Sequence, residues 1–297
     1  MKVGFIGIGA MGRHMSRHAL EGGYELVVND IRKEAAQELL SKGASWGENP
    51  RMIAESCSVV ITSLPMPKDV EDVVYRKDGL RAGWKKGDIF IDMSTNSPSV
   101  IRKIAKDAES NGVAVLDAPV SGGTQGAESG RLTIIVGGEA KILEKSHKIL
   151  ETMGDKIVHV GDVGCGNIAK LINNLIAFGC AHISFEGMVL GAKSGIDVKK
   201  LQEVIASSSG TNFFVQNGLK NVFAGNFEPG FRINLALKDI GLALGMAKEQ
   251  GIPMPLGALI EQQLLAEKAS GLGDKRTESG IIPLERLAGV EVRYPPK

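Results

Sequence analysis

The chain has 297 residues, which is more than one compact core usually holds, so two domains are expected. Hydrophobic residues make up 43% and charged residues 23%, as in an ordinary globular protein. The formal net charge is +1 with both signs mixed along the chain, which argues against a nucleic-acid binder and against attraction to a membrane surface.

Short apolar runs alternate with amphipathic stretches through the first half of the chain. Runs of strand length predict strands, and apolar residues at helical spacing predict helices. The predicted strands are 3–8, 25–28, 59–63, 89–92, 113–117 and 133–136, and the predicted helices include 11–21, 33–41, 98–110 and 141–152. This alternation indicates an α/β fold, a doubly wound parallel sheet with helices on both faces, and residues 1–163 are assigned to it.

The pattern changes after residue 160. Residues 167–194 carry apolar residues at helical spacing with almost no breaker except glycine, which predicts a helix long enough to run between domains. Further helices are predicted at 199–206, 214–223, 234–249 and 256–269. Few strand-like runs remain, so residues 164–297 are predicted to form an all-α domain for substrate binding and oligomerisation.

Targeting segments, metal sites and disulfides are not predicted. No apolar run approaches the ~20 residues of a membrane span, and glycines interrupt the apolar N-terminus, so neither a transmembrane helix nor a signal peptide is expected. The three cysteines, Cys57, Cys165 and Cys180, lie far apart without metal-ligand spacing. This usage fits a reducing, cytoplasmic location.

A glycine-rich loop follows the first predicted strand and opens into a helix. In this loop Gly7 permits a tight turn, Gly9 lets a pyrophosphate approach the backbone, and Gly12 lets helix and strand pack closely. Ala10 and Met11 complete the loop, and the helix dipole favours phosphate at this end. The loop therefore predicts a dinucleotide site and makes residues 1–163 a Rossmann domain, and a ligand-free turn is the alternative.

Asp30 ends the second strand, about twenty residues further on, where an acidic residue binds the ribose hydroxyls of NAD and repels the 2′-phosphate of NADP. Arg32 complicates this prediction, because an arginine there could reach a 2′-phosphate, although a solvated loop arginine is favoured. NAD is therefore the favoured cofactor, with NADP possible.

Three further segments stand out beside the glycine loop: residues 117–127 (DAPVSGGTQGA), 164–174 (GCGNIAKLINN) and 238–243 (KDIGLA). Together, and in this order, the four motifs resemble the β-hydroxyacid dehydrogenase family. That family includes 3-hydroxyisobutyrate dehydrogenases, tartronate semialdehyde reductases and glyoxylate/succinic semialdehyde reductases. The resemblance spans nearly the whole chain and implies an NAD(P)-dependent enzyme that is a homodimer or homotetramer.

Ser121, Gly122 and Gly123 follow a predicted strand at the edge where ligands of such sheets bind. Two glycines expose backbone N–H groups that could hold a carboxylate, and the serine adds a hydroxyl donor. A plain strand-to-helix turn would favour the same residue types. We expect these three residues to bind a small-molecule carboxylate.

Lys170 lies in an otherwise apolar helical stretch, where desolvation would disfavour the charged amine and ease proton exchange. Asn174 is four residues further on and lies on the same helix face. An isolated lysine of this kind would more often extend to water. The resemblance, however, matches Lys170 to the family's catalytic lysine, with Asn174 orienting the substrate.

The resemblance carries over six more positions. Leu64, Pro65, Thr95 and Lys238 match residues on the cofactor side, and Phe231 and Asp239 match residues near the substrate. The alternatives are that Phe231 is a core residue and that Lys238 and Asp239 form an exposed helix pair.

The predicted function is reversible hydride transfer between a nicotinamide dinucleotide and a short β-hydroxy acid or aldehyde acid, with the substrate between the domains and Lys170 as general acid and base. Two alternatives remain. One is a dinucleotide-binding module without catalysis, against which the combination of Lys170, Asn174 and Ser121 argues. The other is an enzyme like the imine reductases, which generally replace the lysine.

Overall fold

The computed structural model describes residues 1–294 and divides into two compact units. The N-terminal unit is Met1–Lys170, and the C-terminal unit begins at Leu171. The predicted boundary at 163/164 lies before this division. The difference arises because the first turn of the long helix is hydrogen-bonded to the N-terminal unit.

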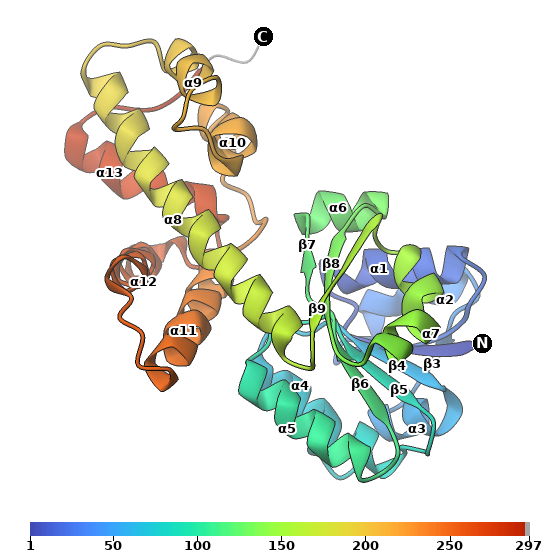
Figure 1. Ribbon diagram of the computed structural model, residues 1–297. Helices are drawn as coiled ribbons and strands as arrows, with labels where there is room; N and C mark the ends of the chain where they lie inside the picture. The colour runs from blue at the N-terminus through green and yellow to red at the C-terminus, as the bar shows by residue number, and fades with distance from the viewer. Residues whose placement is uncertain (295–297) are drawn as a thin grey trace. The chain divides into compact units, whose positions relative to one another are not determined.

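The N-terminal unit is built on a nine-stranded sheet in which β9 pairs with β8 beside the order β3-β2-β1-β4-β5-β6-β8-β7 (Figure 1). The strands are β1 (Lys2–Ile6), β2 (Glu25–Asn29), β3 (Ser45–Trp46), β4 (Val59–Thr62), β5 (Ile89–Asp92), β6 (Ala114–Asp117), β7 (Val120–Ser121), β8 (Thr133–Gly137) and β9 (Lys156–Gly161). The six strands from β3 to β6 are parallel to one another, which is the predicted Rossmann arrangement.

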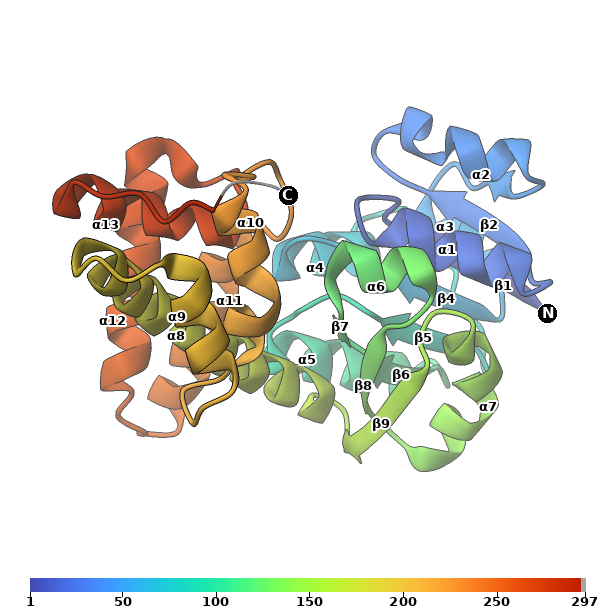
Figure 2. The same cartoon turned by 90° about the horizontal axis from the view of Figure 1, so that it is seen from above.

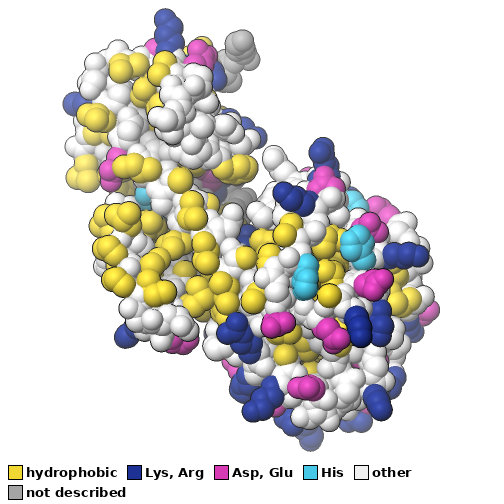
Figure 3. All heavy atoms as spheres, viewed as in Figure 1, with side chains coloured by type: hydrophobic (Ala, Val, Ile, Leu, Met, Phe, Trp, Pro, Cys, Tyr) yellow, Lys and Arg dark blue, Asp and Glu magenta, His cyan; other side chains and the backbone are white. Residues whose placement is uncertain are grey.

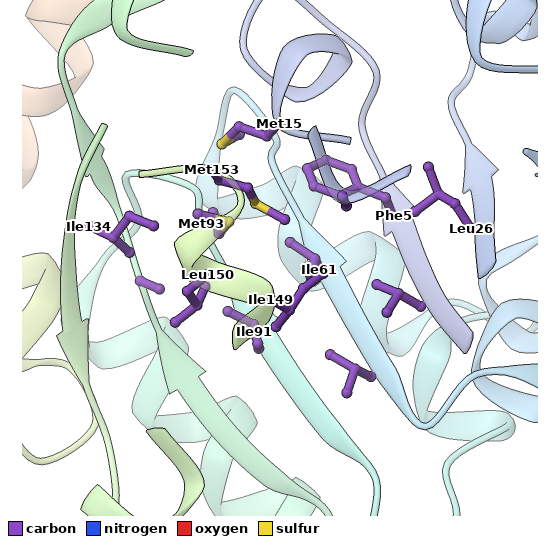
Figure 4. Close-up of a cluster of buried hydrophobic side chains, with 14 of the residues drawn as sticks. Phe5, Met15, Leu26, Ile61, Ile91, Met93, Ile134, Ile149, Leu150 and Met153 are labelled. Atoms are coloured by element: carbon purple, nitrogen blue, oxygen red, sulfur yellow. The ribbon is translucent and has the colours of Figure 1, made fainter. Parts of the chain in front are cut away.

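Side chains of the central strands alternate between two hydrophobic layers. Phe5 and Ile61 face one layer, and Ile6 and Val60 face the other. The first layer is covered by α1 (Gly12–Glu21), α2 (Gln37–Ser41) and α7 (Ala140–Glu151), and the second by α3 (Pro50–Ser56), α4 (Pro67–Tyr75) and α5 (Pro98–Glu109). Figure 4 shows the first layer, in which Met15 and Ile149 from the helices meet the strand residues. Both faces of the sheet are therefore buried, as a parallel sheet requires.

The sheet departs from the predicted parallel arrangement after β6. β8 runs antiparallel to both β6 and β7, and only β9 is parallel to it. The connection from β7 to β8 contains a single short helix, α6 (Gly123–Ser129), which the left-handed Gly130 ends. Such a short connection reverses the chain, whereas α7 provides the longer crossover that a parallel pair needs.

The C-terminal unit is helical (Figure 2). Its α-helices are α8 (Cys165–Lys193), whose first residues belong to the N-terminal unit, α9 (Val198–Ala206), α10 (Leu219–Phe223), α11 (Ile233–Glu249), α12 (Pro255–Glu267) and α13 (Ile281–Ala288). The predicted helices at 214–223 and 256–269 are each part α-helix and part π-helix, with the π turns at Phe214–Gly218 and Lys268–Leu272. The prediction of an α/β domain followed by an all-α domain is confirmed.

By length and composition α8 is able to span a membrane, and 33% of its most apolar window is buried. Core helices of soluble proteins can be equally long and apolar. Phe185 and Met188 of α8 pack into the hydrophobic core of the C-terminal unit. The expectation of no transmembrane helix stays a prediction.

A buried ion pair links α8 to the end of α12. His182 Nε2 lies 3.0 Å from Glu267 Oε1, and His182 Nδ1 lies 2.7 Å from the Phe178 carbonyl oxygen. Both ring nitrogens therefore face acceptors, which suits the doubly protonated imidazolium. Burial alone lowers the pKa of His182, but the hydrogen bond and charge of Glu267 outweigh it and raise the pKa.

The stability of the protein should depend on pH through this pair. Because the folded-state pKa of His182 is raised, its contribution is fully present below the unfolded value of about 6.5 and is lost as pH rises through the folded value. We expect Glu267→Gln to destabilise the protein at pH 6 by about 1.5–3 kcal/mol, the net worth of a hydrogen bond to a charged group.

Urea unfolding followed by circular dichroism between pH 6 and 9 measures this effect. The native protein should lose stability over the range, and Glu267→Gln should lose less. Glu203→Gln, at an exposed position of α9, is the matched control and should behave as the native protein. Equal pH slopes for the native protein and Glu267→Gln would contradict the assignment.

Candidate active site

The glycine loop between β1 and α1 is shaped by close packing at two of its three glycines. A Cβ on Gly12 would lie 1.8 Å from the Gly7 carbonyl oxygen, and a Cβ on Gly7 would lie 2.3 Å from the Ser63 carbonyl oxygen. Gly7 also has a φ of +97°, in the region that favours glycine. Both are therefore required by the protein's own packing, as the sequence predicted.

Gly9 is different, because a Cβ placed there would have no protein atom within 4 Å. The space beside it is thus open on the side where a phosphate would approach. Ala10 is exposed and Met11 half-buried, and α1 begins at Gly12 with no side-chain cap within the described chain. An uncapped helix start next to open space fits a pyrophosphate group.

Asp30 lies directly after β2 and is hydrogen-bonded to this loop. Its Oδ2 accepts a hydrogen bond from the Ile8 N–H at 2.7 Å, and its Oδ1 accepts one from the Arg32 N–H at 2.9 Å. The carboxylate therefore holds the loop in place, a role that the sequence analysis did not identify. Each carboxylate oxygen can accept one more hydrogen bond, so Asp30 can still bind the ribose hydroxyls. The Arg32 side chain is exposed.

The remaining residues of the N-terminal unit that are predicted to lie on the cofactor side are found at the same sheet edge. Leu64 and Pro65 follow β4 and Thr95 follows β5, which is the parallel neighbour of β4. The Leu64 N–H donates to Ser94 Oγ at 2.9 Å and joins the two loops. Ligands of such sheets bind outside the carboxyl ends of the strands where the strand order reverses, here between β1 and β4.

Ser121 is the last residue of β7 and pairs with Thr133 of β8. Gly122 has a φ of +131° and Gly123 a φ of +63°, and both are exposed. The turn into α6 therefore requires both glycines for its backbone alone. Carboxylate binding is a role that this turn permits rather than one that its glycines demand.

Lys170 and Asn174 lie one turn apart near the start of α8, and both are buried, Lys170 with 7% of its surface exposed. Asn174 Nδ2 donates to Asp239 Oδ2 at 2.6 Å, and Lys238 Nζ lies 3.0 Å from Asp239 Oδ1. The alternative of an exposed Lys238–Asp239 pair is wrong, because the two side chains are only 9% and 1% exposed.

Phe231 is not a core residue, because it is 39% exposed. Its ring lies 5.6 Å from that of Phe178, measured between centroids. Phe178 is four residues beyond Asn174 on α8, so both side chains lie on one side of the helix. The C-terminal unit thus gathers Asn174, Asp239, Lys238 and Phe231 around one stretch of α8.

Sequence reasoning missed a group of buried polar residues in the N-terminal unit. Asp92, Asn96 and Asn167 are fully buried and hydrogen-bonded to one another or to Asp117. These residues stand inside or beside the motifs of the sequence. Asp and Asn are also common in exposed loops, so their identity alone did not show that they are buried and hydrogen-bonded.

Family models and relatives of known function match nearly the whole chain. Residues 2–161 match the NAD binding domain of 6-phosphogluconate dehydrogenase, and residues 164–284 match the NAD-binding segment of NADP-dependent 3-hydroxyisobutyrate dehydrogenase. The chain is 38% identical to 2-(hydroxymethyl)glutarate dehydrogenase of Eubacterium barkeri, with 98% of this chain and 97% of the relative covered. The chain belongs to the β-hydroxyacid dehydrogenase family.

Two further relatives support this family membership. The 3-sulfolactaldehyde reductase of Escherichia coli K12 is 33% identical, with 96% of each chain covered. The structure of Mycobacterium tuberculosis 3-hydroxyisobutyrate dehydrogenase with L-serine superposes with a TM-score of 0.87 at 31% identity, covering 95% of this chain and 98% of that one.

Membership of the β-hydroxyacid dehydrogenase family makes this protein a nicotinamide-dependent oxidoreductase of hydroxy acids or their aldehydes. The relatives are dehydrogenases and reductases, so they do not support a binding module without catalysis. Solved imine reductases share the fold at 17–19% identity, and that likeness extends to the fold alone.

Proposed function

We propose that this protein interconverts a short β-hydroxy acid and its aldehyde, with Lys170 as the general acid and base. The observation that carries the proposal is a lysine buried one turn into α8, after a first turn that is hydrogen-bonded to the sheet carrying the predicted dinucleotide loop. When bound, the dinucleotide supplies or accepts the hydride. Lys170 takes the hydroxyl proton during oxidation and returns it to the oxygen during reduction.

The other residues orient the substrate. Ser121 and the N–H groups of Gly122 and Gly123 bind the carboxylate, and the open space beside Gly123 leaves room for it. Asn174 positions the substrate, and its own amide is oriented by Asp239. A buried polar group that is fixed in this way needs little reorganisation as the reaction proceeds.

The names of the relatives support a substrate class. The substrates 2-(hydroxymethyl)glutarate and 3-hydroxyisobutyrate, and the bound L-serine, all carry a hydroxymethyl group on the carbon next to a carboxylate. We infer that this protein oxidises the same unit, HOCH₂–CHX–COO⁻, to the corresponding aldehyde. Glyoxylate and succinic semialdehyde are the competing candidates. Tartronate semialdehyde belongs to the proposed class, because its reduced form, glycerate, carries the same unit with X = OH.

A substrate panel tests this proposal. Initial rates should be measured with 3-hydroxyisobutyrate, 2-(hydroxymethyl)glutarate, L-serine and 3-hydroxypropanoate, and in reverse with tartronate semialdehyde, glyoxylate and succinic semialdehyde. We expect the highest kcat/KM for a member of the hydroxymethyl group. A highest value for glyoxylate or succinic semialdehyde would reject the substrate class, and no turnover with any compound would reject the function.

We also propose NAD rather than NADP as the cofactor. Asp30 stands after β2 beside the glycine loop, where a carboxylate repels a 2′-phosphate. The same panel run with both dinucleotides should give a kcat/KM at least tenfold higher with NAD, which corresponds to about 1.4 kcal/mol of discrimination. Equal values would reject this preference.

The C-terminal unit presents an apolar surface that we assign to a second copy of this chain. Figure 3 shows hydrophobic side chains gathered over α8 and α12. The exposed members on α8 are Ile172, Ile176, Ile183 and Leu190, and on α12 they are Leu256, Leu259 and Leu265. Ile176, Ile183 and Leu190 are spaced seven residues apart and so form one stripe along α8. Pairs of packed helices use the same seven-residue spacing.

Sedimentation velocity tests this assignment. The native protein should sediment as a dimer or tetramer, and the double variant Ile176→Glu/Ile183→Glu as a monomer. Leu287→Glu, at an exposed position of α13, is the control and should keep the native mass. A monomeric native protein would contradict the proposal. Cosedimentation with lipid vesicles that is lost in the double variant would also contradict it, because the stripe would then bind a membrane. A cytoplasmic location stays a prediction.

A further inference from the structure

The first turn of α8 is anchored to the end of β6 by a single buried carboxylate. Asp117 Oδ1 accepts a hydrogen bond from the Gly164 N–H at 2.7 Å, and Asp117 Oδ2 accepts one from the Asn167 N–H at 2.7 Å. Asn167 Nδ2 adds a third bond to the same oxygen at 3.1 Å. A carboxylate on the N–H groups of a helix start acts as a cap supplied from another element.

The other end of the Asn167 amide reaches a different loop. Asn167 Oδ1 accepts a hydrogen bond from the Asn96 N–H at 2.6 Å, and Asn96 Nδ2 donates to Asp92 Oδ2 at 2.8 Å. Asp92 Oδ1 in turn accepts from the Thr62 hydroxyl at 2.9 Å. The chain of bonds therefore runs from β4 and β5 through the loop that carries Thr95 to the first turn of α8.

Tight packing surrounds these hydrogen bonds. All of its polar members, Thr62, Asp92, Asn96, Asp117 and Asn167, have no exposed surface. A Cβ on Gly166 would lie 2.6 Å from the Asp117 carbonyl oxygen, and a Cβ on Gly137 would lie 2.4 Å from Asp117 Oδ1. The helix start cannot shift relative to the strands without breaking buried hydrogen bonds, each of which is costly to leave unmade.

Asn167 uses both ends of its side-chain amide, and through them it joins Asp117 at the end of β6 to Asn96 in the loop after β5. It lies three residues before Lys170, on the same side of α8 and one turn away. We propose that Asn167 is a positioning residue, which locks the first turn of α8 to the Thr95 loop and to Asp117 and so fixes where the Lys170 amine stands.

This inference rests on the proposed role of Lys170, and the experiment separates the two. Asn167→Asp keeps the acceptor for Asn96 but replaces the donor with a second carboxylate facing Asp117. At pH 8 the two charges repel each other, whereas at lower pH the pair can share a proton and restore the missing bond. Asn167→Ala has no group to protonate, and Asn111→Ala, at an exposed position of the same unit, is the control.

We expect Asn167→Ala to lower kcat by about tenfold to a hundredfold, since small misplacements of reacting groups cost up to this much. The KM and the dinucleotide Kd should change less than threefold. Relative to the native protein at each pH, the kcat of Asn167→Asp should recover at least tenfold between pH 8 and pH 5.5, whereas that of Asn167→Ala should not. A role in folding alone would lower the amount of folded enzyme without this pH signature.

Native kcat in Asn167→Ala, or the same pH response in both variants, would overturn the inference. Should Asn167→Asp fail to fold, Asn167→Ser decides by the same comparison of kcat with KM and Kd. Lys170→Ala is run alongside. If it keeps turnover, the proposed function fails. If it is inactive while the Asn167 variants are normal, only the positioning role fails.

Discussion

Lys170→Ala is expected to lose turnover by about a hundredfold to ten-thousandfold, the usual contribution of a general acid or base. Lys170 is buried near the start of α8, and its amine is the group proposed to exchange a proton with the substrate oxygen. The glycine loop and Asp30 lie on other elements and are unaffected by the change. Dinucleotide binding should therefore stay within about threefold of native, because the losses at two independent sites do not couple.

Two companion variants sharpen this experiment. Lys170→Arg keeps the positive charge, but an arginine does not give up its proton, so it should remain as inactive as Lys170→Ala. Lys145→Ala, at an exposed position of α7, should keep native turnover. Steady-state rates across pH and titration with NADH measure the two properties. Native turnover in Lys170→Arg would show that charge, and not proton transfer, is what the lysine contributes.

Gly9→Ala is expected to lose dinucleotide affinity but keep its stability, whereas Gly12→Ala is expected to lose stability. At Gly9 a methyl group meets no protein atom within 4 Å, so the fold should keep its melting temperature, but the methyl group enters the space assigned to the pyrophosphate. Dinucleotide affinity should fall at least tenfold. At Gly12 the methyl group would lie 1.8 Å from a backbone carbonyl oxygen, so the backbone itself must move. Overpacking of this kind costs about 1–3 kcal/mol or more.

Thermal melting and quenching of tryptophan fluorescence by NADH measure both outcomes on the same samples. Trp46 and Trp84 both belong to the N-terminal unit, so the fluorescence reports on the domain that binds the dinucleotide. Unchanged affinity in Gly9→Ala would mean that the pyrophosphate does not approach this glycine. A native melting temperature in Gly12→Ala would mean that helix and loop are less tightly packed than described.

Local patterns were enough to predict the central strands and the long helix. The strand at 89–92 and the helices at 98–110 and 141–152 are found within one residue of their predicted ends. Hydrophobic periodicity is a short-range signal and reports directly on which side of an element is buried. The glycine loop with Asp30 was equally readable, because Gly7 and Gly12 each answer a local steric demand.

Elements that depend on distant partners were missed. β9 (Lys156–Gly161) has no fully buried residue and becomes a strand only by pairing with β8, and β7 is two residues long. The start of α8 is likewise decided by Asp117, fifty residues earlier in the sequence than Asn167. The sequence alone determined the family motifs and which faces of the main elements are apolar. Tertiary structure alone decided which buried polar groups meet, because a hydrogen bond between remote residues leaves no periodic trace along the chain.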